Sequence, residues 1–303
     1  MATPPKQQVL RPSKAPNLPV APVEYDQRYQ DQFNNALRLY FAEVDNFTQA
    51  LGTNSATSSL SAPYGSFHYD RSTTLTSGIT NVSTTPIPVT STAGYPSSGA
   101  ILIGTEIITY TAITATTFAG TITRGAYSTS TSAHSAGDAI TSVQGTTAAT
   151  VTPMYLNTTD FSNGVVLQGP DNTSKVAFSY SGLYNLQFSA QFVNYASGFN
   201  GSDNVTIWIR QNGADVAASA GIVTVPGSHG GVAGAIIAGW NFFVSVPTIT
   251  FNNASPPVSN QYIELYWTTD SGNSVIQTYP SGTTPVHPVS PALILTAQFV
   301  SAL

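Results

Sequence analysis

The sequence predicts a mainly β protein with an extended N-terminal arm, one α-helix, a small β-module and a C-terminal antiparallel jelly-roll sandwich. Three observations support this fold class. Only residues 25–51 have the apolar spacing of a long helix. After residue 85, short runs of β-branched and aromatic residues alternate with turn residues. Charged residues make up only 8% of the chain, against roughly 25% in typical soluble domains, so we expect a neutral surface rich in hydroxyl groups.

Residues 1–24 are predicted to form an extended arm, because six prolines favour an extended chain that has no core of its own. The composition fits two alternatives. The segment is either a disordered tail or an arm that becomes ordered when it docks on a partner surface. The second alternative predicts that Lys6, Arg11 and Lys14 help to anchor the chain.

Residues 25–51 are predicted to form an amphipathic helix that can act as a short coiled coil. Its apolar residues recur at spacings of three and four, which keeps them on one side of the helix. A helix of about three heptads is marginal alone in water and gains stability by burying this stripe. The stripe could pack on its own domain or on the same helix of sister chains. We favour self-association, because the next segment has too few apolar residues to form a core, and we expect the interface to contain Phe33, Leu37, Tyr40, Val44, Phe47 and Leu51.

Residues 52–85 are Ser/Thr-rich and are predicted to be an extended connector. Residues 86–146 are predicted to form a small β-module of hairpins, which is marginal alone at this size. Glu106 stands among β-branched residues, and Arg124 is the only basic residue of the module. We expect these two side chains to pair and not to act in catalysis. The predicted strands of the module are 101–103, 106–111 and 117–123.

Residues 147–303 are predicted to form the antiparallel sandwich. Its strands alternate or are continuously apolar, and clusters of Gly, Asn, Asp and Pro separate them. Asn212-Gly213 is a strong hairpin signal after one of these strands. The predicted strands are 176–180, 184–192, 205–210, 240–246, 262–268 and 292–300.

No pattern in the sequence indicates chemistry. The chain has no cysteine, and none of its four histidines has a partner at metal-ligand spacing. A nucleophile elbow is absent, and the acids after residue 71 are isolated residues, mostly in turns. We therefore predict no enzyme, no catalytic residue, no metal site and no cofactor. A glycosidase-type carboxylate pair stays a remote alternative, because the separation of such a pair cannot be read from sequence.

The charge distribution and hydropathy also limit the partners. Residues 72–303 carry three basic and eight acidic side chains, so no basic patch attracts nucleic acid. The first residues lack the apolar core of a secretory signal, and no run of about eighteen apolar residues predicts a membrane span. We expect neither a nucleic-acid partner nor a membrane partner.

Two stretches carry a resemblance to known families. The pattern G-x-I-x-I-G-x-E-x-I-x-Y-T at 99–111, with T-R-G at 123–125 and H-S-A-G at 134–137, resembles a β-module of tailed-phage structural proteins. The C-terminal part resembles the trimeric jelly-roll heads of the tumour-necrosis-factor and complement type, and especially the version at the C-termini of phage structural proteins and fibres. The second resemblance depends on SGLYNLQFSAQ at 181–191, VTIWIRQNGADV at 205–216, YIELYW at 262–267 and PALILTAQFV at 291–300.

The resemblance implies a homotrimer whose interface contains Tyr184, Phe188, Tyr262 and Tyr266. It implies a non-enzymatic virion protein at the particle surface: a head fibre or decoration protein that residues 1–51 attach to the capsid. The alternative is a tail fibre or tail-tip protein that recognises a host surface glycan. Its glycan-facing residues would be Tyr195, Phe199 and Tyr279, which stand in aromatic and Asn/Ser-rich loops. A depolymerase is a third hypothesis.

Overall fold

The chain consists of two compact units, Met1–Ala62 and Pro63–Leu303, and each is described by itself. The computed structural model describes residues 24, 27–52, 62–169, 173–197, 201–251, 259–283 and 285–303; for 45–52 and 283 it describes the backbone alone. Within these residues the protein is mainly β, with one helix and antiparallel sheets, which confirms the predicted fold class.

The first unit contains the helix α1, Gln27–Gly52, which confirms the predicted helix. Its apolar seam, defined here as Tyr29, Phe33, Leu37, Tyr40 and Val44, lies on one side and is half-exposed. The rings of the first two seam residues stack, with centroids 6.1 Å apart. None of the side chains described between residues 27 and 44 is fully buried. An apolar seam that remains half-exposed along a helix is suited to packing against another helix.

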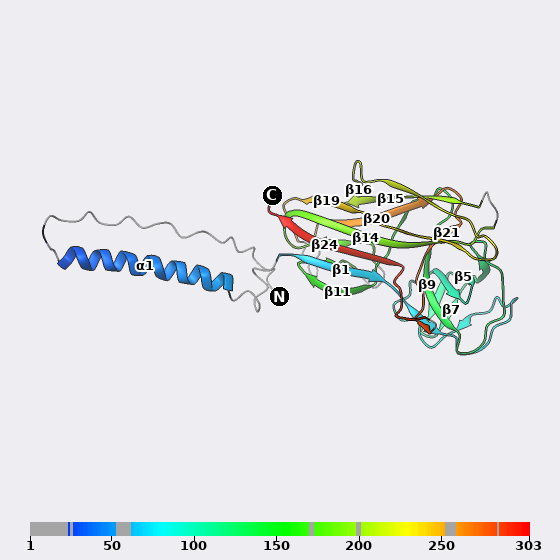
Figure 1. The fold of residues 1–303 in the computed structure, drawn as a ribbon. Coiled ribbons are helices and arrows are strands. Elements are labelled where there is room, and N and C mark those ends of the chain that lie inside the picture. The colour runs from blue at the N-terminus through cyan, green and yellow to red at the C-terminus, as the bar shows by residue number, and fades with distance from the viewer. Residues whose placement is uncertain are drawn as a thin grey trace. The chain divides into compact units, whose positions relative to one another are not determined.

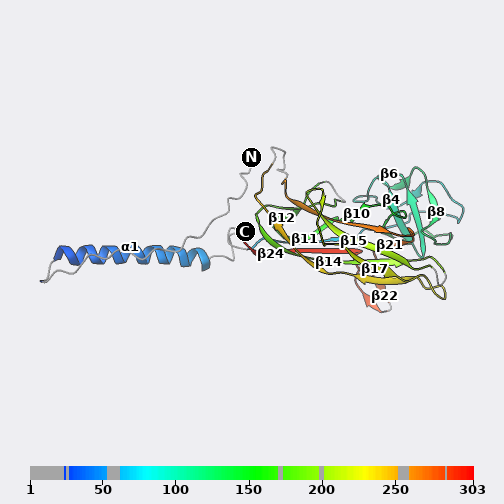
Figure 2. The ribbon, with the colours of Figure 1, turned by 90° about the horizontal axis from the view of Figure 1, so that it is seen from above.

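The second unit is a sandwich of two antiparallel sheets with a small β-module at one end (Figures 1 and 2). The larger sheet has the order β11 (Thr158–Asn163), β1 (Tyr64–Tyr69), β24 (Leu293–Ser301), β14 (Gly182–Asn194), β21 (Ser274–Gln277), β9 (Ala139–Gly145), β4 (Gly99–Ile103), β5 (Glu106–Tyr110) and β8 (Thr123–Ala126). Three further strands join it: β18 (Gly234–Ala238) and β19 (Asn241–Val246) on β14, and β2 (Ser72–Thr74) on β9.

The other sheet of the sandwich covers the inner face of β14 and its neighbours. Its order is β12 (Val165–Leu167), β13 (Val176–Phe178), β20 (Tyr262–Thr269), β15 (Asp203–Gln211) and β16 (Ala214–Asp215), with β10 (Thr152–Pro153) on β20 and β17 (Gly221–Val225) on β15. Two small sheets complete the described strands: β3 (Ile87–Pro88), β7 (Thr117–Ala119) and β6 (Ala112–Thr114), and the pair β22 (Gly282–Thr283) and β23 (Val286–His287).

The main core lies between the two large sheets. Side chains on alternate positions of β14 point inward, because successive side chains of a strand face opposite sides of a sheet. Tyr184 meets Phe178 with ring centroids 4.5 Å apart, and Phe192 meets Trp267 at 5.6 Å. These contacts join strands of opposite sheets, so the aromatic residues of β14 fix the spacing of the sandwich.

The β-module has a core of its own but is continuous with the sandwich. Strand β9 pairs with β21 of the sandwich, and β4 then pairs with β9. The module core contains residues from 75 to 140, among them Ile101, Ile103, Phe118 and Ile140. A third cluster of buried residues, which includes Val143, Val193 and Val275, joins the module to the sandwich. The predicted boundary between separate domains at 146/147 is therefore wrong, since residues 63–303 form one compact unit.

The predicted extended connector, 52–85, is wrong from residue 63 onward. Residues 64–69 form β1, which pairs with β11 and with β24 of the sandwich. The side chain of Phe67 is fully buried in the main core, and Leu75 is buried in the module core. The segment has too few apolar residues to build a core, as expected, but it contributes those few to cores that other strands complete. Residues 53–61 lie outside the described part of the chain.

The local signals of the sandwich are confirmed. All six strands predicted in the C-terminal part are present, as β13, β14, β15, β19, β20 and β24. Asn212 and Gly213 have φ angles of 53° and 83°, so they form the two-residue turn that joins β15 to β16. The single strand predicted at 117–123 is divided into β7 and β8, because Gly120 adopts a φ of 72° between them.

Candidate functional site

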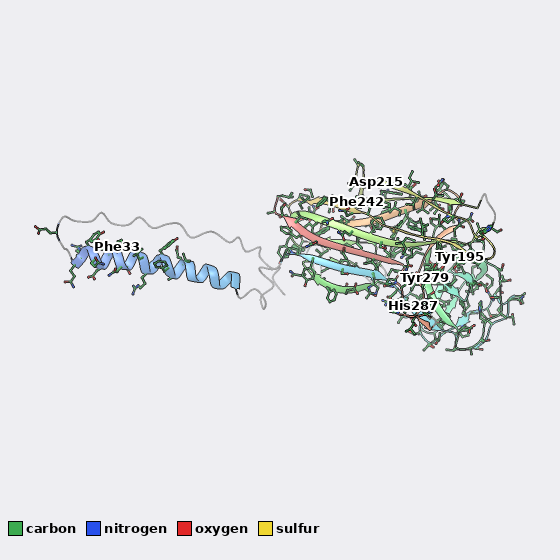
Figure 3. The ribbon with its side chains drawn as sticks, in the orientation of Figure 1. Phe33, Tyr195, Asp215, Phe242, Tyr279 and His287 are labelled. Atoms are coloured by element: carbon green, nitrogen blue, oxygen red, sulfur yellow. The ribbon has the colours of Figure 1, made fainter. Side chains whose placement is uncertain are left out.

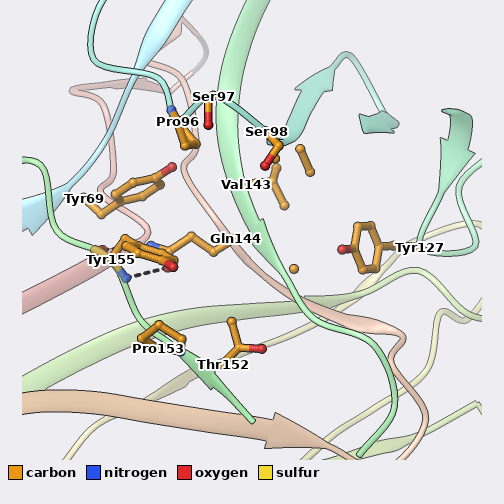
Figure 4. Close-up of a pocket in the computed structure, with 13 residues that line it drawn as sticks. Tyr69, Pro96, Ser97, Ser98, Tyr127, Val143, Gln144, Thr152, Pro153 and Tyr155 are labelled. Atoms are coloured by element: carbon orange, nitrogen blue, oxygen red, sulfur yellow. Dashed lines mark hydrogen bonds between the residues drawn. The ribbon is translucent and has the colours of Figure 1, made fainter. Parts of the chain in front are cut away.

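A pocket of about 360 Å³ lies where the β-module meets the sandwich (Figure 4). The rings of Tyr69 and Tyr155 lie on one side of it and the ring of Tyr127 on the other. None of the lining residues is charged. The full lining is Tyr69, Pro96, Ser97, Ser98, Gly99, Ala100, Tyr127, Val143, Gln144, Gly145, Thr152, Pro153 and Tyr155.

Two hydrogen bonds fix the wall that carries Tyr155. The Tyr155 backbone N–H donates to Gln144 Oε1 at 2.7 Å, and Gln144 Nε2 donates to the Tyr155 carbonyl oxygen at 2.9 Å. Because the amide of Gln144 satisfies both backbone groups of one residue, the chain after β10 is held beside β9. The backbone position of Tyr155 is thus set by the Gln144 side chain of β9.

The opposite wall contains an unusual backbone. Tyr127 and Ser128 have φ angles of 53° and 63°, a left-handed conformation that residues with a side chain rarely adopt. The Ser128 hydroxyl donates to Asn273 Oδ1 at 3.2 Å, which connects this turn to the sandwich. A Cβ placed on Gly145 would overlap the Tyr127 hydroxyl oxygen. The ring of Tyr127 therefore occupies space that only a glycine at position 145 leaves open.

The electrostatics of the pocket suit binding and not acid–base chemistry. Burial raises the pKa of Tyr69 to about 12, and hydrogen bonding from Ser142 lowers it less. Burial also raises the pKa of Tyr127 and of Tyr155. All three phenols therefore stay protonated at neutral pH and can donate hydrogen bonds. The lining residues offer hydroxyl and amide groups, aromatic rings and backbone, and they include neither a carboxylate nor an imidazole.

The outer side of the second sheet carries an aromatic face, defined here as Trp208, Tyr262 and Tyr266. This face adjoins the pocket, because Tyr266 lies beside Pro153 of the pocket lining. Tyr266 pairs with Pro153 on one side and with Trp208 on the other. The Arg210 guanidinium lies 4.2 Å from the centre of the Tyr266 ring, and its Nε donates to Asp215 Oδ1 at 2.6 Å. The same Asp215 oxygen accepts a hydrogen bond from Trp208 Nε1 at 2.8 Å. This face contains both aromatic and charged groups, in contrast to the pocket.

The predicted pair of Glu106 and Arg124 is confirmed, and it forms the centre of a buried cluster. Arg124 Nε and Nη2 donate to the two Glu106 carboxylate oxygens at 2.7 and 2.8 Å. His134 Nε2 lies 2.8 Å from Glu106 Oε2, and the backbone N–H groups of Gly125 and Ser132 donate to the same carboxylate at 3.0 Å. The side chains of Glu106, Arg124 and His134 are 0%, 5% and 5% exposed. Glu106, Arg124 and His134 are the acidic, basic and histidine residues of the module pattern, and their contacts join segments of the chain around positions 106, 124 and 132–134.

The Glu106 cluster predicts a pH dependence of stability. Burial alone would raise the pKa of Glu106, but hydrogen bonds from Arg124, Ser132 and His134 outweigh it and hold the pKa at about 2, below the ordinary value of 4.5. A depressed folded-state pKa stabilises the fold fully above pH 4.5, and this stabilisation is lost as the pH falls toward 2. We expect unfolding midpoints to drop more steeply through this window in the natural chain than in Glu106→Gln. Parallel pH profiles of the two proteins would contradict this assignment.

Two residues predicted at a trimer interface are buried in the chain's own core, so that prediction is wrong for them. Tyr184 is 0% exposed, and its hydroxyl donates to the Tyr180 carbonyl oxygen at 2.9 Å. Phe188 is 6% exposed and packs edge to face against Trp240, with ring centroids 4.8 Å apart. Both side chains face inward on β14, so neither offers a surface that a sister chain could cover.

The other predicted site residues have different outcomes. Tyr262 and Tyr266 are half-exposed on the aromatic face, and their role in a trimer interface stays a prediction. Tyr195 and Tyr279 are half-buried near the module end of the sandwich (Figure 3), where the Tyr195 hydroxyl donates to Gln277 Oε1 at 2.6 Å. Their glycan-facing role also stays a prediction. Phe199, the arm residues Lys6, Arg11 and Lys14, and the side chains of Phe47 and Leu51 lie outside the described part of the chain.

The sequence did not reveal the pocket. Its lining residues come from segments that are far apart in the chain, around positions 69, 97, 127, 144 and 155. No spacing rule connects these positions, because they meet only through the pairing of β9 with β4 and of β10 with β20. The low content of charged residues, 8% of the chain, is the one signal that agrees with the uncharged lining.

The described residues contain no group of three or more acidic, histidine or cysteine side chains that could hold a metal ion. The same part of the chain contains no helix that is both long and apolar enough to cross a membrane.

Comparisons with known proteins give little information. No protein-family model matches the chain, and no curated protein matches it. Among solved structures, dimeric latent PorU from Porphyromonas gingivalis is similar over 80% of this chain and 24% of the PorU chain, with 9% sequence identity and a TM-score of 0.23. A likeness at this TM-score carries no argument about fold or function.

Proposed function

We propose that this chain is a non-enzymatic structural protein of a tailed-phage virion: a homotrimeric head fibre or decoration protein attached to the capsid through residues 1–51. The observation that carries the proposal is the apolar seam of α1, which is half-exposed over the described side chains of the helix. Half-exposed apolar side chains on one side of a helix favour association with a second helix. Sister copies of the same helix supply such a partner in a homotrimer.

The Glu106 cluster supports a structural role for the module. Its ion pair is buried, its carboxylate accepts hydrogen bonds from backbone and side chains, and it lies in the part of the sequence that resembles the phage module. A buried carboxylate with a pKa of about 2 stays ionised at neutral pH and cannot act there as a general acid. The chemistry of this cluster favours stabilisation of turns over catalysis.

Deletion of residues 1–24 tests the anchoring role. We expect the shortened chain to form oligomers with the same number of copies as the full chain, because the helix seam is intact, and to be missing from purified particles. The matched control replaces Lys6, Arg11 and Lys14 with Gln in the full chain, which should reduce incorporation less than the deletion does. Incorporation of the deleted chain at the level of the full chain would remove the arm from the proposal.

A second candidate function, a tail fibre or tail-tip protein that binds a host surface glycan, is favoured by one observation. The pocket between the β-module and the sandwich, which we call the junction pocket, has an aromatic, hydroxyl-rich and uncharged lining. Ligand pockets of about 300–1,000 Å³ with a few placed polar groups are typical small-molecule sites. In this role the second unit, Pro63–Leu303, which we call the β unit, would be the part of the chain that meets the host.

A further inference from the structure

We propose that the junction pocket binds one sugar unit of an uncharged saccharide, between Tyr127 on one wall and Tyr69 and Tyr155 on the other. The inference rests on the second proposed function, in which the β unit meets a host surface. It assigns the ligand to a place different from the loops of Tyr195 and Tyr279 that the sequence indicates.

The residues that line the pocket disfavour charged ligands and purely apolar ligands. An anionic ligand would need an arginine, a lysine or a helix N-terminus, and a cation would need carboxylates. None of the lining residues is charged, and the lining contains no helical residue. A purely apolar ligand would take the hydroxyls of the half-buried Tyr127 and of the exposed Tyr155 out of water without a hydrogen-bond partner, which is unfavourable. A neutral ligand with several hydroxyl groups is compatible with all of these groups.

The lining also supplies the contacts that a sugar ring needs. Aromatic rings give the pocket flat apolar surfaces, against which the C–H face of a sugar can lie. The hydroxyl groups of Ser97 and Ser98 also line the pocket, together with the Thr152 hydroxyl and the Gln144 amide. The Thr152 hydroxyl already shares a hydrogen bond with Thr146, and the Gln144 amide already holds the Tyr155 backbone. These groups both donate and accept hydrogen bonds, as sugar hydroxyls do. Among the described residues, the hydroxyls of Tyr127 and Tyr155 have no hydrogen-bond partner, so they are available to a ligand.

Both walls are held in place before any ligand arrives. The two hydrogen bonds between Gln144 and the backbone of Tyr155 fix one wall. The other wall depends on two successive left-handed residues, Tyr127 and Ser128, and such strained positions cluster at ligand sites. Rigid walls reduce the entropy that is lost on binding, so a small ligand can bind without rearrangement of the protein.

The test is titration of the full chain with single sugars, followed by ligand-observed NMR or calorimetry. The neutral probes are D-glucose, D-galactose and N-acetyl-D-glucosamine, and D-glucuronate is the charged counterpart of glucose. A monosaccharide has about a dozen non-hydrogen atoms, so we expect a Kd in the millimolar range for at least one neutral probe. We expect glucuronate to bind about tenfold or more weakly than glucose, because the pocket offers its charge no partner.

Two variants place the binding in the pocket. Gly145→Ala introduces a Cβ that would overlap the Tyr127 hydroxyl oxygen, and Tyr155→Ala removes the opposite ring. Each should weaken sugar binding by about tenfold or more while the unfolding midpoint shows that the protein is folded. If Gly145→Ala does not fold, Tyr155→Ala alone tests whether the sugar binds in the pocket. The matched control is Tyr64→Ala, which removes a tyrosine that is exposed on β1 and should leave binding unchanged.

The outcomes separate this inference from the proposed function. The inference is overturned if no neutral probe binds at about 100 mM, if glucuronate binds more tightly than glucose, or if both pocket variants bind as the natural chain does. Competition of the full chain with phage adsorption to host cells tests the receptor role separately. Blocked adsorption without sugar binding would keep the receptor role and reject this pocket, whereas sugar binding without blocked adsorption would keep the pocket and reject the receptor role.

Discussion

Replacing Glu106 with Gln is expected to lower the free energy of unfolding of the β unit by about 3–5 kcal/mol, the usual cost of removing one partner of a buried ion pair. The Arg124 side chain is 5% exposed, and two of its nitrogens donate to the Glu106 carboxylate. The substitution keeps the shape of the side chain but leaves the guanidinium buried without an opposite charge. Its remaining acceptors are the backbone carbonyl oxygens of Thr80, Ser83 and Ser132. Chemical denaturation, followed by tryptophan fluorescence, measures the difference.

The chain offers a matched control for this substitution. Asp215 pairs with Arg210 at 2.6 Å, a distance similar to that in the Glu106 cluster, but the Asp215 side chain is 60% exposed. Asp215→Asn therefore removes an ion pair of similar length, made by one nitrogen and one oxygen, that water already screens. It should change the unfolding midpoint little. If the two substitutions destabilise the protein equally, burial is not the reason that the cluster matters.

Replacing Phe33 or Leu37 with Ser is expected to dissociate the oligomer. Both side chains belong to the seam of α1, and a serine at either position removes the apolar surface that a neighbouring helix would cover. A helix of this length in water depends on such packing, so we also expect a loss of helical signal in circular dichroism. Sedimentation velocity at micromolar concentration measures the mass.

Leu39→Ser is the matched control for the seam. Leu39 is 59% exposed and lies on the side of α1 away from the seam. The same leucine-to-serine change at this position should leave the mass of the protein unchanged. Equal dissociation by Leu37→Ser and Leu39→Ser would mean that the helix matters through its stability and not through a specific seam.

The parts of the fold that could be predicted are those that local pattern determines. The helix and the strands of the sandwich follow from apolar spacings of 3.6 and 2 residues, and the turn at Asn212-Gly213 follows from the φ angles that these residues tolerate. Pairing of Glu106 with Arg124 could be predicted because the module contains one basic residue and few acidic ones. Each of these features needs only a short stretch of sequence.

The failed predictions concern contacts between distant segments. The strand at 64–69 looks like part of a polar connector, and it becomes a strand because it pairs with 158–163 and meets Leu293. Alternation along β14 indicates that one face is buried, but it does not say whether that face meets a sheet of the same chain or a sister chain. The structure places Tyr184 and Phe188 on the intrachain face.

The candidate pocket could not be predicted for the same reason. Its two walls belong to segments around Tyr127 and Tyr155, and their meeting requires that the module sheet and the sandwich sheet be continuous through β9 and β21. The left-handed backbone at Tyr127 and Ser128 could not be predicted, because neither position is a glycine or an asparagine, the residues that usually adopt it. Sites of this kind become visible only when the tertiary pairing is known.

The mass of the purified full chain in solution tests the central claim, self-association through the helix, most directly. We expect a particle of three chains of 31.7 kDa each at micromolar concentration, and we expect dilution to separate them only well below that range. A single-chain mass throughout the micromolar range would contradict the account, since the half-exposed seam of α1 would then have no sister helix to cover it.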